Sequence, residues 1–281
     1  MTYHEARKQA AKALSSAGIE QAETESRLLM EYATQTESGF YLLHREDDMS
    51  PGEEESYFAL IGARCTRIPL QHLTGEQEFM GLKFLVNENV LIPRQDTEVL
   101  AERAVSFLTG AEGARVLDLG TGSGCLAVSI KAFCPNAAVC GSDIFSEALQ
   151  VAEENARRNQ TEITWIKSDL FAEIEGQFDL IVSNPPYIPT NVIGTLMPEV
   201  RDHDPRAALD GGPDGLDFYR RILAGCGEHL QPGGRLLFEI GQEQGEAVTA
   251  LMRENGFAEI EVTPDLTGAD RVVTGRNKQH V

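Results

Sequence analysis

The strongest constraint on the fold of this chain is a regular alternation of short apolar runs and helical segments that begins at about Asp96. The runs Arg115–Leu119 and Phe178–Val182 have the length of buried strands, and Ser146–Asn159 has the length and charge of a surface helix. Because parallel strands are joined by crossover helices, this order predicts a mostly parallel sheet with helices on both faces. Further strands are expected at Ala137–Asp143, Ile163–Lys167, Arg235–Ile240, Glu259–Val262 and Arg271–Thr274, and further helices at Phe218–Leu230, at Gln244–Asn255 and up to about Phe133.

Residues 1–75 have a different pattern and are expected to form a separate helical domain. Helices are predicted over Tyr3–Ala17 and Ala22–Ala33. A third begins after Ser50, which can cap it while Glu53 closes the capping box. No group of catalytic residue types occurs here, so the chemistry is expected later in the chain.

Residues 76–95 are predicted to form a β-hairpin linker to a catalytic domain at 96–281. Apolar and polar residues alternate loosely through this segment, as they do in short strands. The turn is expected at Asn87-Glu88-Asn89. The alternating apolar residues are Phe79, Leu82, Phe84, Val86, Val90 and Ile92.

The charge balance restricts what this chain can bind. It has 281 residues, with 24 Lys plus Arg against 44 Asp plus Glu, so the formal net charge is −20. Phosphate backbones and anionic membranes repel such a chain, and no apolar run reaches the roughly 18 residues of a membrane span. We expect a monomeric, cytoplasmic protein with no nucleic-acid partner and no membrane partner.

Metal and thiol chemistry have little support in the sequence. The five cysteines include no CxxC pair, which argues against a zinc site or a disulfide framework. No spacing of His, Asp and Glu suggests a metal, so none is expected. His203 could contact a substrate or anchor its own loop, and His229 lies near a predicted helix end, where a cation is favourable.

A glycine-rich turn follows the strand Arg115–Leu119 and opens the next helix. Glycines let a ligand approach the backbone closely, and the helix N-terminus presents free N–H groups. The spacing GxGxG is neither the dinucleotide fingerprint GxGxxG nor a P-loop. The alternative interpretation is a tight structural turn. The turn consists of Gly120, Thr121, Gly122, Ser123 and Gly124.

Two acidic residues follow the next strands of the predicted sheet. Asp143 ends a strand about 20 residues after the glycine turn, where a carboxylate can accept hydrogen bonds from ribose hydroxyls. Asp169 follows another strand, where it could accept from an adenine amino group while Leu170 and Phe171 flank the ring. Either aspartate could instead cap the helix after it.

The segment Asn184-Pro185-Pro186-Tyr187 follows the apolar strand that ends near Val182. The prolines fix φ and lack N–H groups, so the loop is stiff, and Asn184 is biased to extended geometry. The Asn184 side-chain oxygen and the Pro185 carbonyl can then both point outward as acceptors. Two convergent acceptors suit a planar –NH₂ group, and Tyr187 offers a flat face for stacking on it.

Together, the glycine turn, Asp143 and the NPPY segment resemble class I S-adenosylmethionine methyltransferases that methylate planar amines and amides. Most of the chain is similar to the bacterial peptide chain release factor glutamine methyltransferases. The segments that carry this similarity are Gln71–Phe79, Leu91–Glu98, His203–Gly212 and Asp270–Val273.

The resemblance implies a Rossmann-like domain that uses S-adenosylmethionine to methylate the glutamine of the GGQ motif in class 1 release factors. Gln95 stands where proline is common and Leu170 where an aromatic residue is common, so either Leu170 or Phe171 packs on the adenine. Residues 1–75 would recognise the protein substrate. The glycine turn with Asp143, Asp169, Leu170 and Asn184 would bind the cofactor, and Asn184, Pro185, Pro186 and Tyr187 would carry catalysis.

Other functions remain open at this point. An NPPY segment also serves methylation of an exocyclic base amine in nucleic acid, with the base flipped out. The charge of −20 and the lack of a basic stripe argue against that substrate. A glutamine of a ribosomal protein is a second alternative substrate. A non-catalytic S-adenosylmethionine-binding scaffold is a third interpretation, and the intact NPPY segment argues against it.

Overall fold

The computed structural model describes residues 1–37 and 39–278, and the chain divides into two compact units. Unit 1 comprises residues 1–75 and 197–203. Unit 2 comprises residues 76–196 and the chain from 204 onward. The chain therefore passes from unit 2 into unit 1 at residues 197–203 and then re-enters unit 2.

Unit 1 is a small helical bundle around Leu14, Leu29 and Tyr57, which are fully buried. The Tyr57 hydroxyl donates to the Ser26 carbonyl oxygen at 2.9 Å, so the buried ring also satisfies its polar end. The capping box predicted at Ser50 is present, with both of its hydrogen bonds. The helices are α1 (Tyr3–Ser16), α2 (Ala22–Thr34), α3 (Phe40–His44), α4 (Pro51–Cys65) and α5 (Leu70–Thr74).

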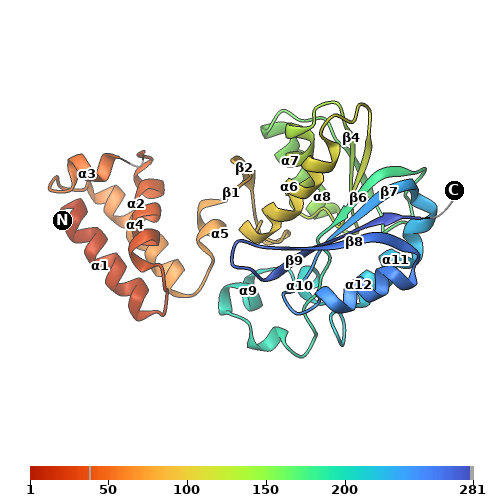
Figure 1. Cartoon of the computed structure of the whole chain (residues 1–281). Coiled ribbons are helices and arrows are strands. Elements are labelled where there is room, and N and C mark those ends of the chain that lie inside the picture. The colour runs from red at the N-terminus through yellow and green to blue at the C-terminus, as the bar shows by residue number, and fades with distance from the viewer. Residues whose placement is uncertain (38, 279–281) are drawn as a thin grey trace. The chain divides into compact units, whose positions relative to one another are not determined.

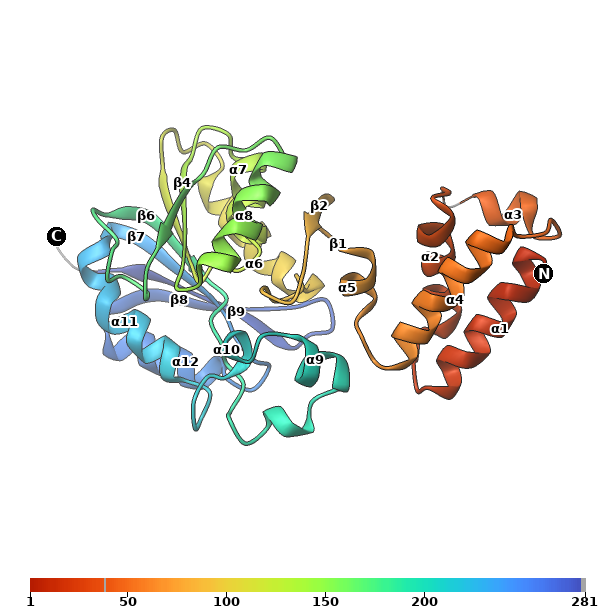
Figure 2. The same cartoon turned by 180° about the vertical axis from the view of Figure 1, so that it is seen from behind.

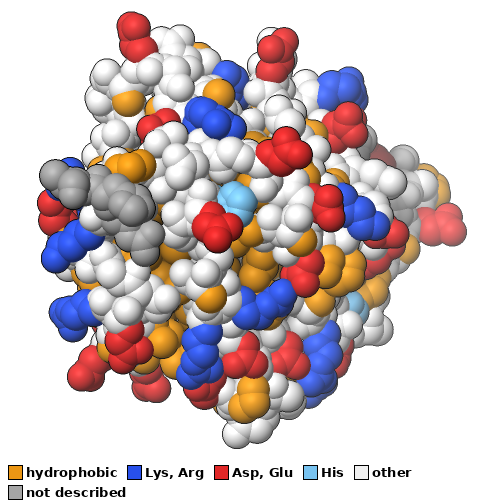
Figure 3. Space-filling model, turned by 90° about the vertical axis from the view of Figure 1, so that its right-hand side faces the viewer, with side chains coloured by type: hydrophobic (Ala, Val, Ile, Leu, Met, Phe, Trp, Pro, Cys, Tyr) orange, Lys and Arg blue, Asp and Glu red, His pale blue; other side chains and the backbone are white. Residues whose placement is uncertain are grey.

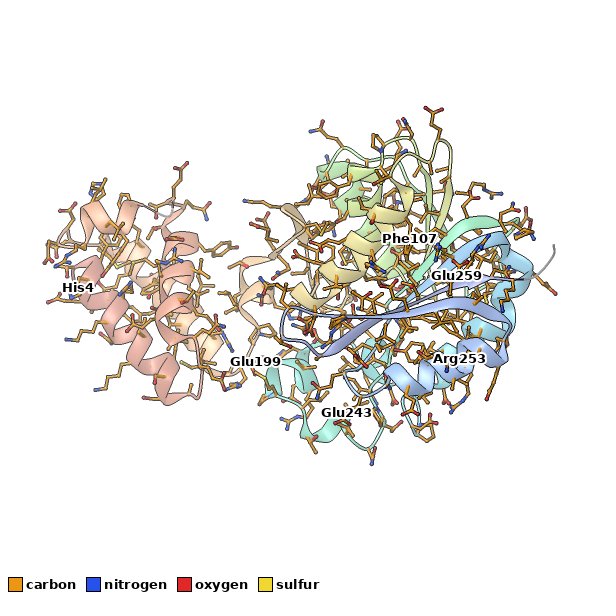
Figure 4. All side chains as sticks on the ribbon, in the orientation of Figure 1. His4, Phe107, Glu199, Glu243, Arg253 and Glu259 are labelled. Atoms are coloured by element: carbon orange, nitrogen blue, oxygen red, sulfur yellow. The ribbon has the colours of Figure 1, made fainter. Side chains whose placement is uncertain are left out.

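Helix α9 (Pro198–His203) forms the returning segment of unit 1. Its Glu199 carboxylate, labelled in Figure 4, pairs with Arg64 at 2.9 Å and with Arg67 at 2.6 Å. Arg64 is buried and also pairs with Glu25 at 2.6 Å. The Arg64 charge is thus fully paired, as a buried guanidinium requires.

The hairpin at the start of unit 2 pairs β1 (Glu76–Phe79) with β2 (Leu82–Leu85). The prediction of a hairpin is confirmed, but the expected turn position is wrong. The chain turns at Met80 and Gly81, both with positive φ, rather than at Asn87-Glu88-Asn89. A two-residue hairpin turn of this type needs φ > 0 at both positions, which the glycine adopts without strain.

The core of unit 2 is a seven-stranded sheet in the order β5-β4-β3-β6-β7-β9-β8, drawn in Figures 1 and 2. The first five strands in this order are parallel, and β9 pairs antiparallel with both β7 and β8. This mixed α/β arrangement confirms the predicted fold class. The strands are β3 (Arg115–Leu119), β4 (Ala138–Asp143), β5 (Thr164–Lys167), β6 (Phe178–Ser183), β7 (Leu230–Glu239), β8 (Phe257–Pro264) and β9 (Asp270–Asn277).

Helices cover both faces of this sheet. One core cluster joins α6, α7 and α8 to the sheet, and the other joins α11 and α12. Each face therefore buries its own apolar layer, which is why the central strands are apolar almost throughout. The helices are α6 (Glu98–Leu108), α7 (Cys125–Phe133), α8 (Ser146–Arg158), α11 (Asp217–His229) and α12 (Gly245–Glu254). The shorter helices are η1 (Gln95–Thr97), η2 (Ile193–Thr195) and α10 (Arg206–Leu209).

Strand β7 begins earlier than expected. The sequence predicts a strand only from Arg235, because Pro232, Gly233 and Gly234 have the composition of a turn. In the structure these residues lie within β7, which already pairs with β6 at Leu230. The β6–β7 register shifts between Phe178 and Leu180, so the glycines form an irregularity within the strand. Arg235 then pairs with Glu259 at 3.1 Å and lies over the Phe107 ring. Glu259 and Phe107 are labelled in Figure 4.

Candidate active site

A cavity of about 310 Å³ opens at the carboxyl ends of the parallel strands of unit 2. The turns after β3, β4, β5 and β6 line it, together with residues just before α6 and around α10. Ligands of open parallel sheets bind at this edge. The cavity brings together the glycine turn, Asp143, Asp169, Leu170 and Asn184–Pro186.

The glycine turn joins β3 to α7. Gly120, Gly122 and Gly124 all have positive φ, which a residue with a Cβ adopts only with strain. A Cβ at Gly120 or Gly122 would meet no atom within 4 Å, so the backbone there borders open space. A Cβ at Gly124 would lie 3.0 Å from the Ala152 side chain, so this glycine serves helix packing instead.

Asp118 lies beneath the glycine turn and is fully buried. Its Oδ2 accepts from the Thr121 hydroxyl at 2.6 Å and from the Ala127 N–H at 3.2 Å. Burial raises the pKa of Asp118 to about 7, against the lowering effect of these two hydrogen bonds. Asp118 is not among the predicted site residues, although an acidic residue inside an apolar strand signals such a buried role.

Asp143 ends β4 beside the glycine turn. Its Oδ2 accepts from the Gly122 N–H at 3.0 Å and its Oδ1 from the Phe145 N–H at 3.0 Å. Burial raises the pKa of Asp143, and these backbone hydrogen bonds counteract the rise. Each carboxylate oxygen keeps acceptor capacity for a further donor in the cavity.

The three residues of the turn after β5 have different surroundings. Asp169 pairs with Arg221, whose guanidinium lies 2.8 and 2.9 Å from the two carboxylate oxygens. Leu170 has φ of 52° and lines the cavity. Phe171 stacks on His229, with ring centroids 4.8 Å apart and planes 2° apart. Of the two candidates for apolar contact with an adenine, the geometry favours Leu170.

The NPPY loop begins directly after β6. Asn184 Nδ2 donates to the Thr97 hydroxyl at 3.3 Å, and Pro185 is buried. Asn184, Pro185 and Pro186 line the cavity, whereas the Tyr187 ring packs against the core cluster of α11 and α12. Burial raises the pKa of Tyr187, so its hydroxyl stays neutral. The expected stacking role of Tyr187 stays a prediction.

Glu239 lies behind Asn184 and was missed by the sequence analysis. It ends β7, is 1% exposed and lies within reach of hydrogen bonds from the Asn184 and Thr97 side chains. Burial raises the pKa of Glu239 to about 7, while those bonds and the Arg271 charge act to lower it. The signal in the sequence is one acidic residue in the apolar run Leu236-Leu237-Phe238-Glu239-Ile240.

The segment after α9 forms another wall of the cavity. Arg94 pairs with the buried Asp204, and Pro205, Ala207 and Ala208 line the cavity. Asp204 and Pro205 hold the chain where it re-enters unit 2. His203 belongs to unit 1 and is not among the residues that line this cavity.

Within residues 1–37 and 39–278, no cluster of His, Cys, Asp and Glu has the arrangement of a metal site. All five cysteines are free thiols, and Cys125, Cys140 and Cys226 are buried. Among the described helices, none has the length and apolar character needed to cross a bilayer. On the face drawn in Figure 3, acidic and basic side chains are interspersed rather than gathered into a basic stripe.

Comparison with known proteins finds similarity along most of the chain. A family model described as the PrmC N-terminal domain matches residues 5–75, and one described as the methyltransferase small domain matches residues 96–196. A release factor glutamine methyltransferase of Geobacter sulfurreducens is 43% identical, over 94% of this chain and 92% of its own. The Moorella thermoacetica enzyme of that name is 42% identical, over 96% and 97%.

Solved structures share the fold at lower identity. A methyltransferase from Pyrococcus furiosus superposes with a TM-score of 0.52 at 21% identity, over 71% of this chain and 90% of its own. A 16S rRNA methyltransferase of Thermus thermophilus gives a TM-score of 0.51 at 18% identity, over 72% and 49%. At this identity the likeness extends to the fold alone.

Proposed function

Because the chain belongs to the release factor glutamine methyltransferase family, we propose that it methylates the side-chain amide nitrogen of a glutamine in class 1 peptide chain release factors. The proposed target is the glutamine of the GGQ motif, and the proposed methyl donor is S-adenosylmethionine. The observation that carries this proposal is one cavity shared by the glycine turn and the Asn184–Pro186 loop. The shared cavity supports a site for the methyl donor next to a site for the substrate amide.

The residues in the cavity fit S-adenosylmethionine. Open backbone at Gly120 and Gly122 leaves room for the amino-acid part of the cofactor, with Thr121, Ser123 and Gly124 shaping that turn. Asp143 has acceptor capacity for ribose hydroxyls. Leu170 and Asp169 line the place for the adenine, and Asn184 borders the reacting centre. The bound cofactor supplies an electrophilic methyl group on a sulfonium sulfur.

An amide nitrogen is a poor nucleophile because its lone pair is delocalised into the carbonyl, so the chain must orient it. Asn184 Oδ1 and the Pro185 carbonyl oxygen accept its two hydrogens, which turns the lone pair toward the methyl group. Held by the glycine turn and Asp143, the cofactor would supply the methyl group to this nitrogen and would leave with the electron pair of the S–C bond. The methylated nitrogen is then strongly acidic and releases one proton to water, so no dedicated base is needed beforehand.

Holding the amide and the methyl group in line supplies much of the rate enhancement. Well-oriented intramolecular reactions gain about 7–11 kcal/mol in this way. Pro186 walls the cavity beside the amide, and the stiff Pro185-Pro186 pair limits how far the acceptors can move. No described residue among 1–75 lines this cavity, and we assign this region to recognition of the release factor away from the glutamine.

Intact-mass analysis of a purified release factor, after incubation with this protein and S-adenosylmethionine, tests the proposal. We expect the release factor to gain the mass of one methyl group, and we expect peptide mapping to locate that group on the GGQ glutamine. The proposed enzyme is a monomer that acts in the cytoplasm. Methyl label in ribosomal RNA, DNA or a ribosomal protein instead would reject the release factor as substrate while keeping methyl transfer.

A further inference from the structure

We propose that Glu239 is a positioning residue, which holds the Asn184 amide with its oxygen toward the substrate and strengthens that oxygen as an acceptor. The inference rests on the proposed function, because it concerns how Asn184 receives the substrate amide. Three side chains carry it: Asn184 from the loop after β6, Glu239 from the end of β7, and Thr97 just before α6.

The sheet register places Glu239 beside Asn184. Strands β6 and β7 are parallel, and Ser183 pairs with Phe238. Asn184, the first residue after β6, therefore lies beside Glu239, the last residue of β7, at the edge where the cavity opens. Thr97 reaches the same place from another element and is 2% exposed. Glu239 and Thr97 are therefore shielded from water, whereas Asn184 borders the cavity.

The hydrogens of the group can be counted. Asn184 Nδ2 carries two N–H groups, of which one points to the Thr97 hydroxyl oxygen at 3.3 Å. The Glu239 carboxylate lies within hydrogen-bonding reach of both Asn184 and Thr97, which act to lower its pKa. An ionised Glu239 has no hydrogen to donate, so it accepts the second N–H of Asn184 and the O–H of Thr97. Asn184 Oδ1 receives no hydrogen within this group.

Glu239 is the member that decides which way the Asn184 amide faces. A threonine hydroxyl is both donor and acceptor, so Thr97 alone would accept either end of the amide. An ionised carboxylate accepts only, so it stabilises the orientation with Nδ2 inward and Oδ1 toward the cavity. An outward Nδ2 would present hydrogens to a substrate amide that needs acceptors.

The same contact strengthens the acceptor. A hydrogen bond from an amide N–H to a buried carboxylate polarises the amide and increases the negative charge on its oxygen. Positive charge develops on the substrate nitrogen as the methyl group is transferred, and Asn184 Oδ1 accepts a hydrogen from that nitrogen. The ionised Glu239 therefore favours the transition state through Asn184, without contacting the substrate.

The charged surroundings leave Glu239 able to change its protonation. Arg271 of β9 favours the ionised form, whereas Asp96 of η1 disfavours it. Tyr187 and Tyr219 face it as neutral hydroxyls, and the buried thiol of Cys125 is also within electrostatic range. Protonated Glu239 could donate to Asn184 Oδ1 and so compete with the substrate amide. Its Oε2 has no hydrogen-bond partner among the described residues, which leaves a position for that proton.

The test compares wild type with Glu239→Gln at saturating S-adenosylmethionine, using release-factor methylation to measure kcat against pH. The glutamine has nearly the same shape but adds donors and carries no charge. We expect kcat to fall about 10- to 100-fold, as for outer partners that orient a functional side chain. The cofactor dissociation constant, measured by calorimetry, should stay within about 2-fold, since Asp143 and the glycine turn are untouched.

The pH profile separates positioning from a structural role. In wild type, kcat should rise with pH through an apparent pKa near that of Glu239, and Glu239→Gln should lack this step. Asp118 titrates in the same range, so Asp118→Asn is run in parallel and should keep the step. A Glu239→Gln enzyme with normal kcat, with weakened cofactor binding, or with the step intact would overturn the proposal.

Variants of Thr97 keep the proposal testable if Glu239→Gln does not fold. Thr97→Val removes the hydroxyl between Asn184 and Glu239 and should lower kcat, whereas Thr97→Ser should restore it. Thr274→Val is the matched control, because it removes a buried hydroxyl of β9 that has no partner among the described residues. Equal kcat values for Thr97→Val and Thr274→Val would reject the role of this group.

Failure of this inference is distinguishable from failure of the proposed function. A wild-type enzyme that methylates the GGQ glutamine, together with a Glu239→Gln enzyme of equal kcat, rejects only the inference. A wild-type enzyme that adds no methyl group to a release factor rejects the proposed function first. The inference is rejected with it, because the substrate amide it requires is then absent.

Discussion

The Asp143 carboxylate accepts a hydrogen bond from the Gly122 N–H at 3.0 Å, which ties the glycine turn after β3 to the end of β4. The second carboxylate oxygen accepts from the Phe145 N–H. One side chain thus fixes the loops on two sides of the cavity and keeps acceptor capacity toward it. Ribose recognition and loop geometry therefore depend on the same residue.

We expect Asp143→Ala to weaken S-adenosylmethionine binding about 10- to 100-fold, because hydrogen bonds to a charged group contribute about 1.5–3 kcal/mol. Asp143→Asn, which keeps one acceptor, should lose less. Isothermal titration calorimetry measures both. The control is Asp179→Ala, since Asp179 accepts the Arg115 N–H at 2.8 Å away from the cavity. Equal losses in Asp143→Ala and Asp179→Ala would reject a direct contact with the cofactor.

Gly211 packs directly against the NPPY loop. A Cβ there would lie 2.8 Å from the Pro186 carbonyl oxygen and 2.8 Å from the Tyr187 Cα. These are backbone atoms, so Gly211→Ala must displace the loop. We expect kcat to fall by up to about 100-fold, as for a misplacement of about 1 Å, while cofactor affinity is retained.

The control for Gly211→Ala is Gly194→Ala in the same excursion between β6 and α11. A Cβ at Gly194 meets nothing within 4 Å, and this glycine lacks the positive φ that would strain an alanine. Its kcat should equal that of wild type. A Gly211→Ala enzyme with unchanged single-turnover rate would show that the loop tolerates the displacement.

The parallel part of the fold could be predicted because each strand carries its own signal. The strand expected at Ala137–Asp143 is β4 (Ala138–Asp143), and the strand at Arg115–Leu119 is found unchanged. Apolar runs bounded by turn residues are local information. The hairpin turn was misplaced because Asn87-Glu88-Asn89 has stronger turn composition than Met80-Gly81, although only the latter lies between the paired strands.

The lining of the candidate site could be predicted as motifs, but its supporting residues could not. Asn184 and Asp143 follow strands, and the strand order brings the ends of strands together. Glu239 and Thr97 meet Asn184 from positions far away in the sequence. Their contact depends on the β6–β7 register and on where α6 begins, which no local pattern specifies. The insertion of 197–203 into unit 1 is unpredictable for the same reason.

Asn184 is expected to affect turnover far more than cofactor binding. Asn184→Ala removes one of two acceptors for the substrate amide, so kcat should fall at least about 100-fold, as after loss of one fixed polar group in an active site. Calorimetry should show S-adenosylmethionine affinity near that of wild type. Asn255→Ala is the control, because Asn255 bonds only within its own helix end, to the Leu251 carbonyl oxygen. Near-normal turnover in Asn184→Ala would refute the two-acceptor mechanism.

The buried Asp118 should make the stability of unit 2 depend on pH. Its pKa is about 7 in the folded protein against an ordinary aspartate value of 3.8, so the folded state binds more protons between these values. The free energy of unfolding therefore falls as pH rises through this range, and the contribution of Asp118 is fully present only below the unfolded pKa. Glu239, with a pKa raised to about 7, acts in the same direction.

We expect Asp118→Asn to reduce this pH dependence and to raise the free energy of unfolding at pH 8 relative to wild type. The asparagine oxygen can accept the Thr121 and Ala127 hydrogens that Asp118 Oδ2 accepts, and no charge is then buried. Urea unfolding at pH 5 and pH 8 measures the difference. The outcome that contradicts this argument is an equal loss of stability in Asp118→Asn at both pH values, which would mean that the carboxylate shape, and not its proton, determines the packing beneath the glycine turn.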